Sequence, residues 1–415
     1  MAVGRPHQFY HSRGFIAARV KWVRDPYLDA AVSREKDLKP VISLKNQIIS
    51  SPSNSLPLSS VSLLKQPQHH HHFNNLPTKA IKFLQKYSSL FTQFQPAPSF
   101  PLHVKLTRQA FSLYREEDLA IHRSPTHRYG AVQRLAKLLM LTGATGRGRR
   151  LPFHVIDRFK FDLGLPHNYV TSLLSDFPEY FHVSQVSDGM LCLELVSWRD
   201  ELAVSEMERR AARGDLRNIK KGQRIGFSLS YPNGFELEKK VKDWVVEWQC
   251  LPYISPYEDA FHLNPNGDQA EKWTVAVLHE LLWLLVSKKT ERDNLVCLGQ
   301  YLGFGDRFKK ALVHHPGIFY ISNKIRTQTV VLREAYRKDF LVEKHPLVGM
   351  RFRYIRLMNK RRKSVGSLSP SRVKRQGVLP AIKDQGQEVK NGCREGEEDK
   401  LNSAEENHGL LKMEI

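Results

Sequence analysis

Hydrophobic and polar positions follow the same order three times along this chain of 415 residues. Each copy has a Leu-Pro or Phe-Gly turn, a short amphipathic run, a corner that ends in Phe, and a short apolar stretch that alternates. The corners are Ser88-Ser89-Leu90-Phe91, Pro178-Glu179-Tyr180-Phe181 and Pro316-Gly317-Ile318-Phe319, and the alternating stretches cover 104–106, 193–195 and 330–332. Helical spacing followed by alternation predicts a helix, a corner and then strands in each copy.

Longer apolar stripes at helical spacing predict additional helices at 26–50, 131–141, 234–251, 270–287 and 293–301. With these helices, each unit reads helix, helix, turn, helix, corner and two strands joined by a turn. The predicted fold is mainly α within the α+β class, with repeated helical modules and short β-hairpins that are winged-helix-like. The copies span about 26–110, 130–205 and 270–337. A plain helical repeat is the alternative, because such short alternation is a weak strand signal.

The two ends of the chain differ in composition from its middle. No acidic residue precedes Asp25 while several Arg do, which predicts an organelle transit peptide over 1–19, and Arg13-Gly14-Phe15 resembles a mitochondrial processing site. A disordered basic start is the alternative. After Lys363, Ser, Gly, Pro and charged residues dominate, so 364–415 is predicted to be a disordered tail. The four histidines at 69–72 favour a low-complexity insertion over a metal site.

The formal net charge of the chain is +22. The predicted tail holds eight Lys and Arg against nine Asp and Glu, so the positive excess lies in the folded part. A charge of this size attracts phosphate and favours a nucleic-acid partner, although some proteins are simply basic.

Clusters of Lys and Arg are the candidate contacts to RNA or DNA, since the arginine fork donates two parallel hydrogen bonds to a phosphate. Any one cluster taken alone is as consistent with a solvated face. The basic candidates are Arg147, Arg149, Arg150, Arg209, Arg210, Lys220, Lys221, Arg224, Lys309, Lys310, Arg351, Arg353, Arg356, Arg361 and Arg362. Tyr253 and Tyr257, in a Pro-rich turn, are candidates for stacking on unpaired bases. Trp244 and Trp248 lie one helical turn apart on an apolar stripe, which favours a place in the core.

Catalytic motifs are missing from the sequence. It has no phosphate-binding Gly-rich loop ending in Gly-Lys-Ser/Thr and no Gly-x-Ser-x-Gly elbow. His279-Glu280 begins like a zinc-protease helix, but Trp283 stands where the second ligand is needed. None of the four cysteines forms a Cys-x-x-Cys pair, and the apolar stretch 275–286 is shorter than the ~20 residues that span a bilayer. We therefore expect a protein that is not an enzyme, with no catalytic residue, no metal, no cofactor and no membrane segment.

Several strings of the sequence resemble the plant organelle RNA recognition family over about residues 20–358. They are Lys21-Trp22-Val23-Arg24-Asp25-Pro26-Tyr27-Leu28-Asp29, Leu56-Pro57-Leu58-Ser59-Ser60, Arg134-Leu135-Ala136-Lys137-Leu138-Leu139-Met140, Leu251-Pro252-Tyr253-Ile254-Ser255-Pro256-Tyr257, His314-His315-Pro316-Gly317-Ile318-Phe319-Tyr320 and Lys344-His345-Pro346-Leu347. The resemblance implies a non-catalytic protein that binds organellar intron RNA, works with other splicing factors in a ribonucleoprotein and promotes group II intron splicing.

The organelle and the class of partner have alternatives. The short leader favours the mitochondrion over the chloroplast. A DNA-binding organellar regulator would use Lys309 and Lys310 on a recognition helix. A protein–protein scaffold would use the charge only for import and solubility.

Overall fold

The computed structural model describes residues 22–63, 79–143, 148–186, 189–213 and 220–360. The predicted transit peptide, the four histidines, Arg147, Arg361, Arg362 and the predicted tail lie outside these described residues.

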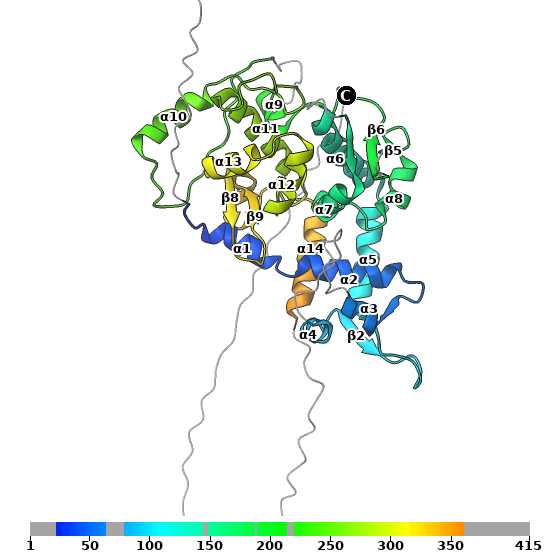
Figure 1. Cartoon of the computed structure of the whole chain (residues 1–415). Coiled ribbons are helices and arrows are strands. Elements are labelled where there is room, and N and C mark those ends of the chain that lie inside the picture. Colours follow the sequence, from blue (N-terminus) through cyan, green and yellow to red (C-terminus); the bar gives the residue numbers. More distant parts are fainter. Residues whose placement is uncertain (1–21, 64–78, 144–147, 187–188, 214–219, 361–415) are drawn as a thin grey trace, which may run out of the picture. The chain divides into compact units, whose positions relative to one another are not determined.

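Three small antiparallel sheets, each with its own helices, organise the chain (Figure 1). The first module comprises α2 (Leu38–Ser50), β1 (Ser55–Pro57), α3 (Leu58–Leu63), α4 (Ala80–Lys86), β2 (Phe91–Phe94) and β3 (His103–Leu106). The second comprises α6 (Pro125–Gly143), β4 (Arg150–Pro152), α7 (Phe153–Leu163), α8 (Tyr169–Ser172), β5 (Phe181–Gln185) and β6 (Leu191–Leu195). The third comprises α11 (Asp268–Leu284), β7 (Lys289–Glu291), α12 (Arg292–Tyr301), α13 (Arg307–His314), β8 (Phe319–Ser322) and β9 (Thr329–Leu332).

The strand orders are β1-β3-β2, β4-β6-β5 and β7-β9-β8. The predicted α+β class is confirmed, and the comparison with winged helices stays a prediction. The expectation of two strands in each copy is wrong, because a third strand pairs antiparallel with β3, β6 or β9. In the first two modules this strand ends in a Leu-Pro pair, and proline is tolerated there because the strand lies at the sheet edge.

The remaining elements connect or cover the modules. They are α1 (Pro26–Arg34), α5 (Arg108–Glu117) with a π-helical turn at Asp118–His122, α9 (Glu206–Ala211), α10 (Lys239–Gln249), the pair β10 (Tyr336–Arg337) and β11 (Phe340–Leu341), and α14 (Pro346–Asn359). The single helix predicted at 26–50 is two helices, because Asp37 has a left-handed φ of 63° between α1 and α2. The helix predicted at 234–251 starts only at Lys239.

Two main hydrophobic cores hold the described residues together. The second and third modules share one core, into which Trp248 is fully buried and against which Trp244 packs, so the core prediction for both rings is confirmed. The first module has a separate core, which α14 completes through Leu347, Tyr354 and other apolar residues. Val286, which follows α11, also belongs to the core of the first module, and Phe161 of α7 packs against it, so a few apolar contacts cross the boundary between modules.

The start of the described chain packs on the third module (Figure 1). The indole of Trp22 donates to the carbonyl of Ile321 at 3.1 Å. On α1, one carboxylate oxygen of Asp29 accepts from the Tyr320 hydroxyl at 2.9 Å and the Ser322 hydroxyl at 2.7 Å. Part of the string that opens the family resemblance thus attaches α1 to the third sheet, while α2 belongs to the first module.

Candidate nucleic-acid interface

Several predicted basic residues are exposed and belong to separate elements. Arg150 begins β4, Lys309 and Lys310 lie on α13, and Arg356 lies on α14, with Arg149 half-buried beside β4. Lys220, Lys221 and Arg224 are exposed in the segment before α10. These residues stay proposals as phosphate contacts.

Two of these exposed lysines have acidic partners, since Lys309 pairs with Asp306 at 2.8 Å and Lys221 with Glu258 at 3.8 Å. Other predicted cations are also held by carboxylates of this chain. Arg209 and Arg210 both pair with Glu206, and Arg210 also reaches Glu334 at 2.8 Å. Burial lowers the pKa of Arg210, but Glu334 and Glu206 outweigh it, and the pKa is raised. Arg353 pairs with both carboxylate oxygens of Glu116. A phosphate would have to compete with these partners.

The structure corrects the placement of three predicted site residues. Arg351 is buried, with its guanidinium carbon 3.8 Å from the centre of the Phe161 ring, and it donates to the Phe161 carbonyl. Tyr253 and Tyr257 are buried in the shared core, so the prediction that these rings are exposed to bases is wrong. The Tyr257 hydroxyl donates to Glu280 at 2.7 Å, and the Tyr253 hydroxyl lies 3.0 Å from that of Ser205.

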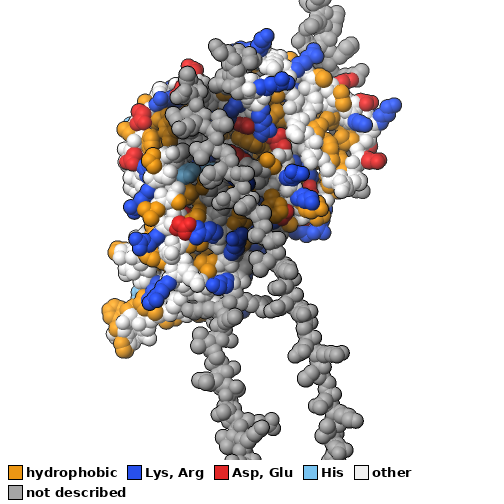
Figure 2. All heavy atoms as spheres, turned by 180° about the vertical axis from the view of Figure 1, so that it is seen from behind, with side chains coloured by type: hydrophobic (Ala, Val, Ile, Leu, Met, Phe, Trp, Pro, Cys, Tyr) orange, Lys and Arg blue, Asp and Glu red, His pale blue; other side chains and the backbone are white. Residues whose placement is uncertain are grey.

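Basic side chains do not gather into one uninterrupted patch on the face that Figure 2 shows. There, Lys and Arg are dispersed among hydrophobic and acidic side chains. The overall charge therefore does not by itself mark a site, and the shape of the surface matters more.

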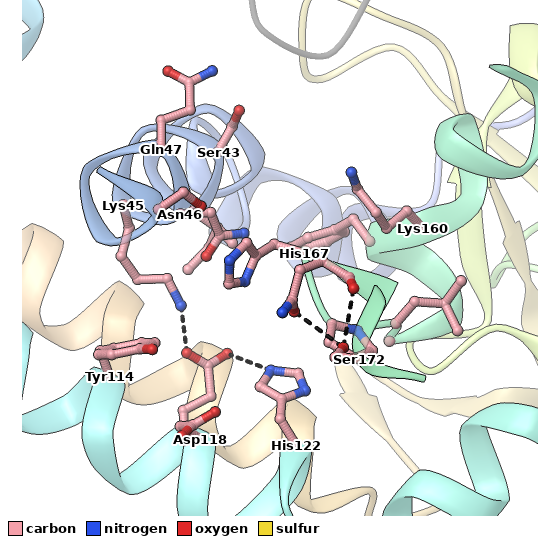
Figure 3. A pocket seen from close by; sticks show the side chains of 18 of the residues that line it. Ser43, Lys45, Asn46, Gln47, Tyr114, Asp118, His122, Lys160, His167 and Ser172 are labelled. Carbon is pink, nitrogen blue, oxygen red and sulfur yellow. Dashed lines mark hydrogen bonds and ion pairs between the residues drawn. The ribbon is translucent and has the colours of Figure 1, made fainter. Parts of the chain in front are cut away.

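A cleft of about 850 Å³ lies between the first and second modules (Figure 3). Helix α2 forms one wall, and the end of α7 with the turn that follows it forms the other. The end of α5, the π-helical turn and α14 supply the floor. Since the walls come from different modules, the cleft exists only when the modules are packed together.

The floor carries a neutralised charge network. Lys45 from α2 lies 2.5 Å from Glu117 of α5, which also accepts from the Tyr354 hydroxyl at 2.9 Å, and His122 approaches its other oxygen at 3.8 Å. Lys45 and His122, both labelled in Figure 3, approach this carboxylate from α2 and from the π-helical turn. Burial would raise the pKa of Glu117, but Lys45 and His122 more than offset that effect and hold it well below its usual range. The carboxylate is thus ionised at neutral pH.

The walls carry neutral polar groups. Asn46 and Gln47 on α2 and His167 after α7 are half-exposed and line the cleft. Within the part of the chain that the structure describes, their side chains make no hydrogen bond. Burial, together with nearby Lys45, His122 and Lys160, lowers the pKa of His167, so its imidazole is neutral at physiological pH.

The rim carries charge. Arg123 has a side chain 72% exposed and pairs with Asp118, and Lys160 pairs with Asp157 at 3.6 Å. Exposed pairs of this kind contribute only about 0–1 kcal/mol, so an incoming phosphate can displace a carboxylate from them. The sequence alone does not predict the cleft, because its lining comes from separate segments and no local pattern marks them.

Two kinds of feature are missing from the described ranges. They hold no group of three or more His, Cys, Asp or Glu side chains placed to bind a metal ion. Nor do they contain a helix with the length and apolar character needed to cross a membrane.

Comparison with known proteins adds independent findings. The family described as "Plant organelle RNA recognition domain" matches residues 23–363. The chain is 34% identical to Protein WHAT'S THIS FACTOR 9, mitochondrial, of Arabidopsis thaliana, over 83% of this chain and 86% of that protein. It is 32% identical to Protein WHAT'S THIS FACTOR 1 homolog, chloroplastic, of Oryza sativa subsp. japonica, over 80% of this chain and 64% of that protein. It is 31% identical to Protein ROOT PRIMORDIUM DEFECTIVE 1 of Arabidopsis thaliana, over 81% of this chain and 82% of that protein. No solved structure matches.

Proposed function

The chain belongs to the plant organelle RNA recognition family, and we propose that it is an organellar RNA-binding protein that promotes group II intron splicing. The observation that carries this conclusion is the family match over residues 23–363, which contains all three modules. The net charge of +22 supports a polyanionic partner.

The mechanism is binding rather than catalysis. The intron RNA supplies the splicing chemistry, and the protein shifts the RNA toward its active fold by binding that fold more tightly. Exposed cations such as Arg150, Lys220, Lys221 and Lys310 hold phosphates, and other splicing factors join the same ribonucleoprotein. The RNA-binding domain spans about 20–358, with a transit peptide before it and a tail after it.

The compartment we propose is the mitochondrion. A relative whose name includes "mitochondrial" is 34% identical, and Arg13-Gly14-Phe15 resembles a mitochondrial processing site. Chloroplastic relatives at 30–32% identity make the plastid the alternative. Imaging of the full chain fused to a fluorescent protein in plant cells would distinguish the two compartments.

RNA sequencing after purification of the tagged protein from plant organelles tests the function. We expect group II intron sequences to be enriched over a mock purification, and affinity for the enriched intron to fall steeply with salt because phosphate contacts release counterions. No enrichment of any intron, together with no binding to purified intron RNA, would contradict the proposal. Binding to purified RNA without other proteins would argue against a protein–protein scaffold.

DNA binding is the second candidate, because Lys309 and Lys310 are exposed on α13, the third helix of its module. Competition between structured RNA and duplex DNA for the purified protein separates the two functions. Preferential binding to the duplex would favour the DNA-binding regulator.

A further inference from the structure

We propose that the cleft between the first and second modules takes unpaired bases of the RNA, which hydrogen-bond with Asn46, Gln47 and His167. This inference rests on the proposed RNA-binding function and assigns one part of it to one place.

Size limits what enters the cleft. Its volume of about 850 Å³ lies within the range of roughly 300–1,000 Å³ that is typical of sites for small organic groups. One or two bases fit a space of this size, whereas a double helix does not. Proteins that read RNA sequence commonly take in bases that are splayed out of loops and bulges in this way.

The chemistry of the walls suits base edges. Each side-chain amide offers a donor and an acceptor, and a neutral imidazole offers one of each, which matches the mixed donors and acceptors of a base edge. Asn46, Gln47 and His167 all line the cleft. In Figure 3, Asn46 and His167 point into the space between α2 and the turn after α7, whereas the amide of Gln47 extends away from His167. Because none of the three is hydrogen-bonded within the described chain, binding a base breaks no protein hydrogen bond.

The charges in and around the cleft favour a base inside and phosphates outside. Deep in the cleft, Lys45 is paired with Glu117 and Lys39 is paired with Asp162 at 3.1 Å. Both cations already have a carboxylate partner, whereas Arg351, which also lines the cleft, lies buried against the Phe161 ring and donates to its carbonyl. At the rim, Arg123 and Lys160 are more exposed and have only weak surface partners. The phosphates next to a bound base would lie against these two residues.

Two RNA probes test the assignment. One is a synthetic RNA hairpin with a wide single-stranded loop taken from a bound intron, and the other is a blunt RNA duplex of the same length. The variant is Asn46→Ala with Gln47→Ala, and the control is Gln300→Ala, which removes an exposed amide from α12, outside the cleft. Dissociation constants come from fluorescence anisotropy, and a thermal melt checks that each variant is folded.

We expect the double variant to bind the loop RNA about tenfold more weakly, since two neutral hydrogen bonds are lost, and to bind the duplex as the wild type does. The control should bind both probes unchanged. An equal loss for both RNAs, or no loss at all, would overturn the assignment. So would tight binding of adenosine monophosphate alone to the wild type, abolished in the double variant, because the cleft would then be a site for free nucleotides.

Crosslinking keeps the test independent of variant folding. The wild type is bound to loop RNA that contains 4-thiouridine, irradiated, digested and analysed by mass spectrometry. Crosslinks within 38–50 or 164–168 support the assignment, and crosslinks found only elsewhere overturn it. If the wild type binds neither RNA, the proposed function itself has failed, which is evident before any variant is compared.

Discussion

Removing the charge of Lys45 should destabilise the protein far more than removing a comparable exposed lysine. The side chains of Lys45 and Glu117 are only 5% and 7% exposed, with Nζ and Oε2 2.5 Å apart. The same carboxylate oxygen accepts from Tyr354, so the contact joins α2, α5 and α14 beneath the cleft. Lys45→Met keeps most of the side-chain volume and removes only the charge.

The magnitude follows from the geometry. At 2.5 Å and an effective dielectric constant of about 20, the attraction is roughly 7 kcal/mol, and the cost of desolvating both ions offsets most of it. Lys45→Met leaves Glu117 buried without its main partner, so the free energy of unfolding at pH 7 should fall by about 3–5 kcal/mol. Glu117→Gln should cost a similar amount, and the double variant should cost less than the sum of the two.

Urea denaturation followed by circular dichroism measures these values. The matched control is Lys86→Met, since Lys86 lies 2.6 Å from Asp37 but has a side chain 53% exposed, and it should cost at most about 1 kcal/mol. The pKa of Glu117 is lower in the folded protein than its ordinary value of 4.5, so its ionised form stabilises the fold at pH values above 4.5. This stabilisation is lost as the pH falls below 4.5 and the carboxylate is protonated. The Lys45→Met penalty should therefore shrink in acid. A penalty at pH 7 no larger than that of Lys86→Met would refute the reasoning.

Three other outcomes are expected. Burial, with nearby Arg134 and Arg351, lowers the pKa of His345 to about 4, so its contribution to stability is complete above the ordinary value of 6.5 and is lost as pH falls toward 4. His345→Asn keeps a side-chain acceptor for the start of α14. Between pH 7 and 5, the free energy of unfolding of this variant, measured by urea denaturation, should fall by about 1 kcal/mol less than that of the wild type. Parallel pH profiles for the two proteins would contradict this. In the same assay, Gly164→Ala should lower the free energy of unfolding by about 2–4 kcal/mol, because φ is 71° and the new Cβ would lie 2.8 Å from Val286. Gly222→Ala has a similar φ of 73° but no atom within 4 Å of its new Cβ, so it should cost only about 1 kcal/mol. Equal costs would show that crowding plays no part. Arg149→Ala with Arg150→Ala should weaken binding to all RNAs and reduce the slope of log affinity against log salt concentration by about 1–2. Unchanged affinity in a salt titration would remove this segment from the interface.

Local patterns in the sequence predict part of this fold. Phe91, Phe181 and Phe319 each begin a strand that pairs with the alternating stretch predicted after it, because corner and alternation are local signals. The third strand of each sheet could not be found in this way. Ser55–Pro57 is three residues long, and its only strand partner lies nearly fifty residues later. The break at Asp37 also escaped prediction, although Pro40, in the first turn of α2, is a signal that a helix starts there.

The misplaced tyrosines have a different cause. Tyr257 lies in a turn rich in proline and serine, which favours exposure when only neighbours in the sequence are considered. Its ring is buried, and its hydroxyl donates a hydrogen bond to Glu280 on α11, a partner 23 residues away in the sequence. A polar turn can fold inward only when distant partners satisfy its hydrogen bonds, and one sequence does not reveal which partners these are.

The arrangement of the cores explains why a polar cleft persists at the boundary between modules. The second and third modules bury their apolar surface in a common core, whereas the core of the first module is completed by α14 and by a few residues of the other modules, such as Val286 and Phe161. Across this boundary, contacts such as Lys39 with Asp162 and Arg351 with the Phe161 carbonyl hold the sides together through polar groups. The cleft lies where charged and amide side chains line this boundary, and half-exposed amides such as Asn46 remain open to a ligand there. Their replacement by alanine should consequently change RNA affinity with little effect on stability, which is the opposite of what is expected for Lys45.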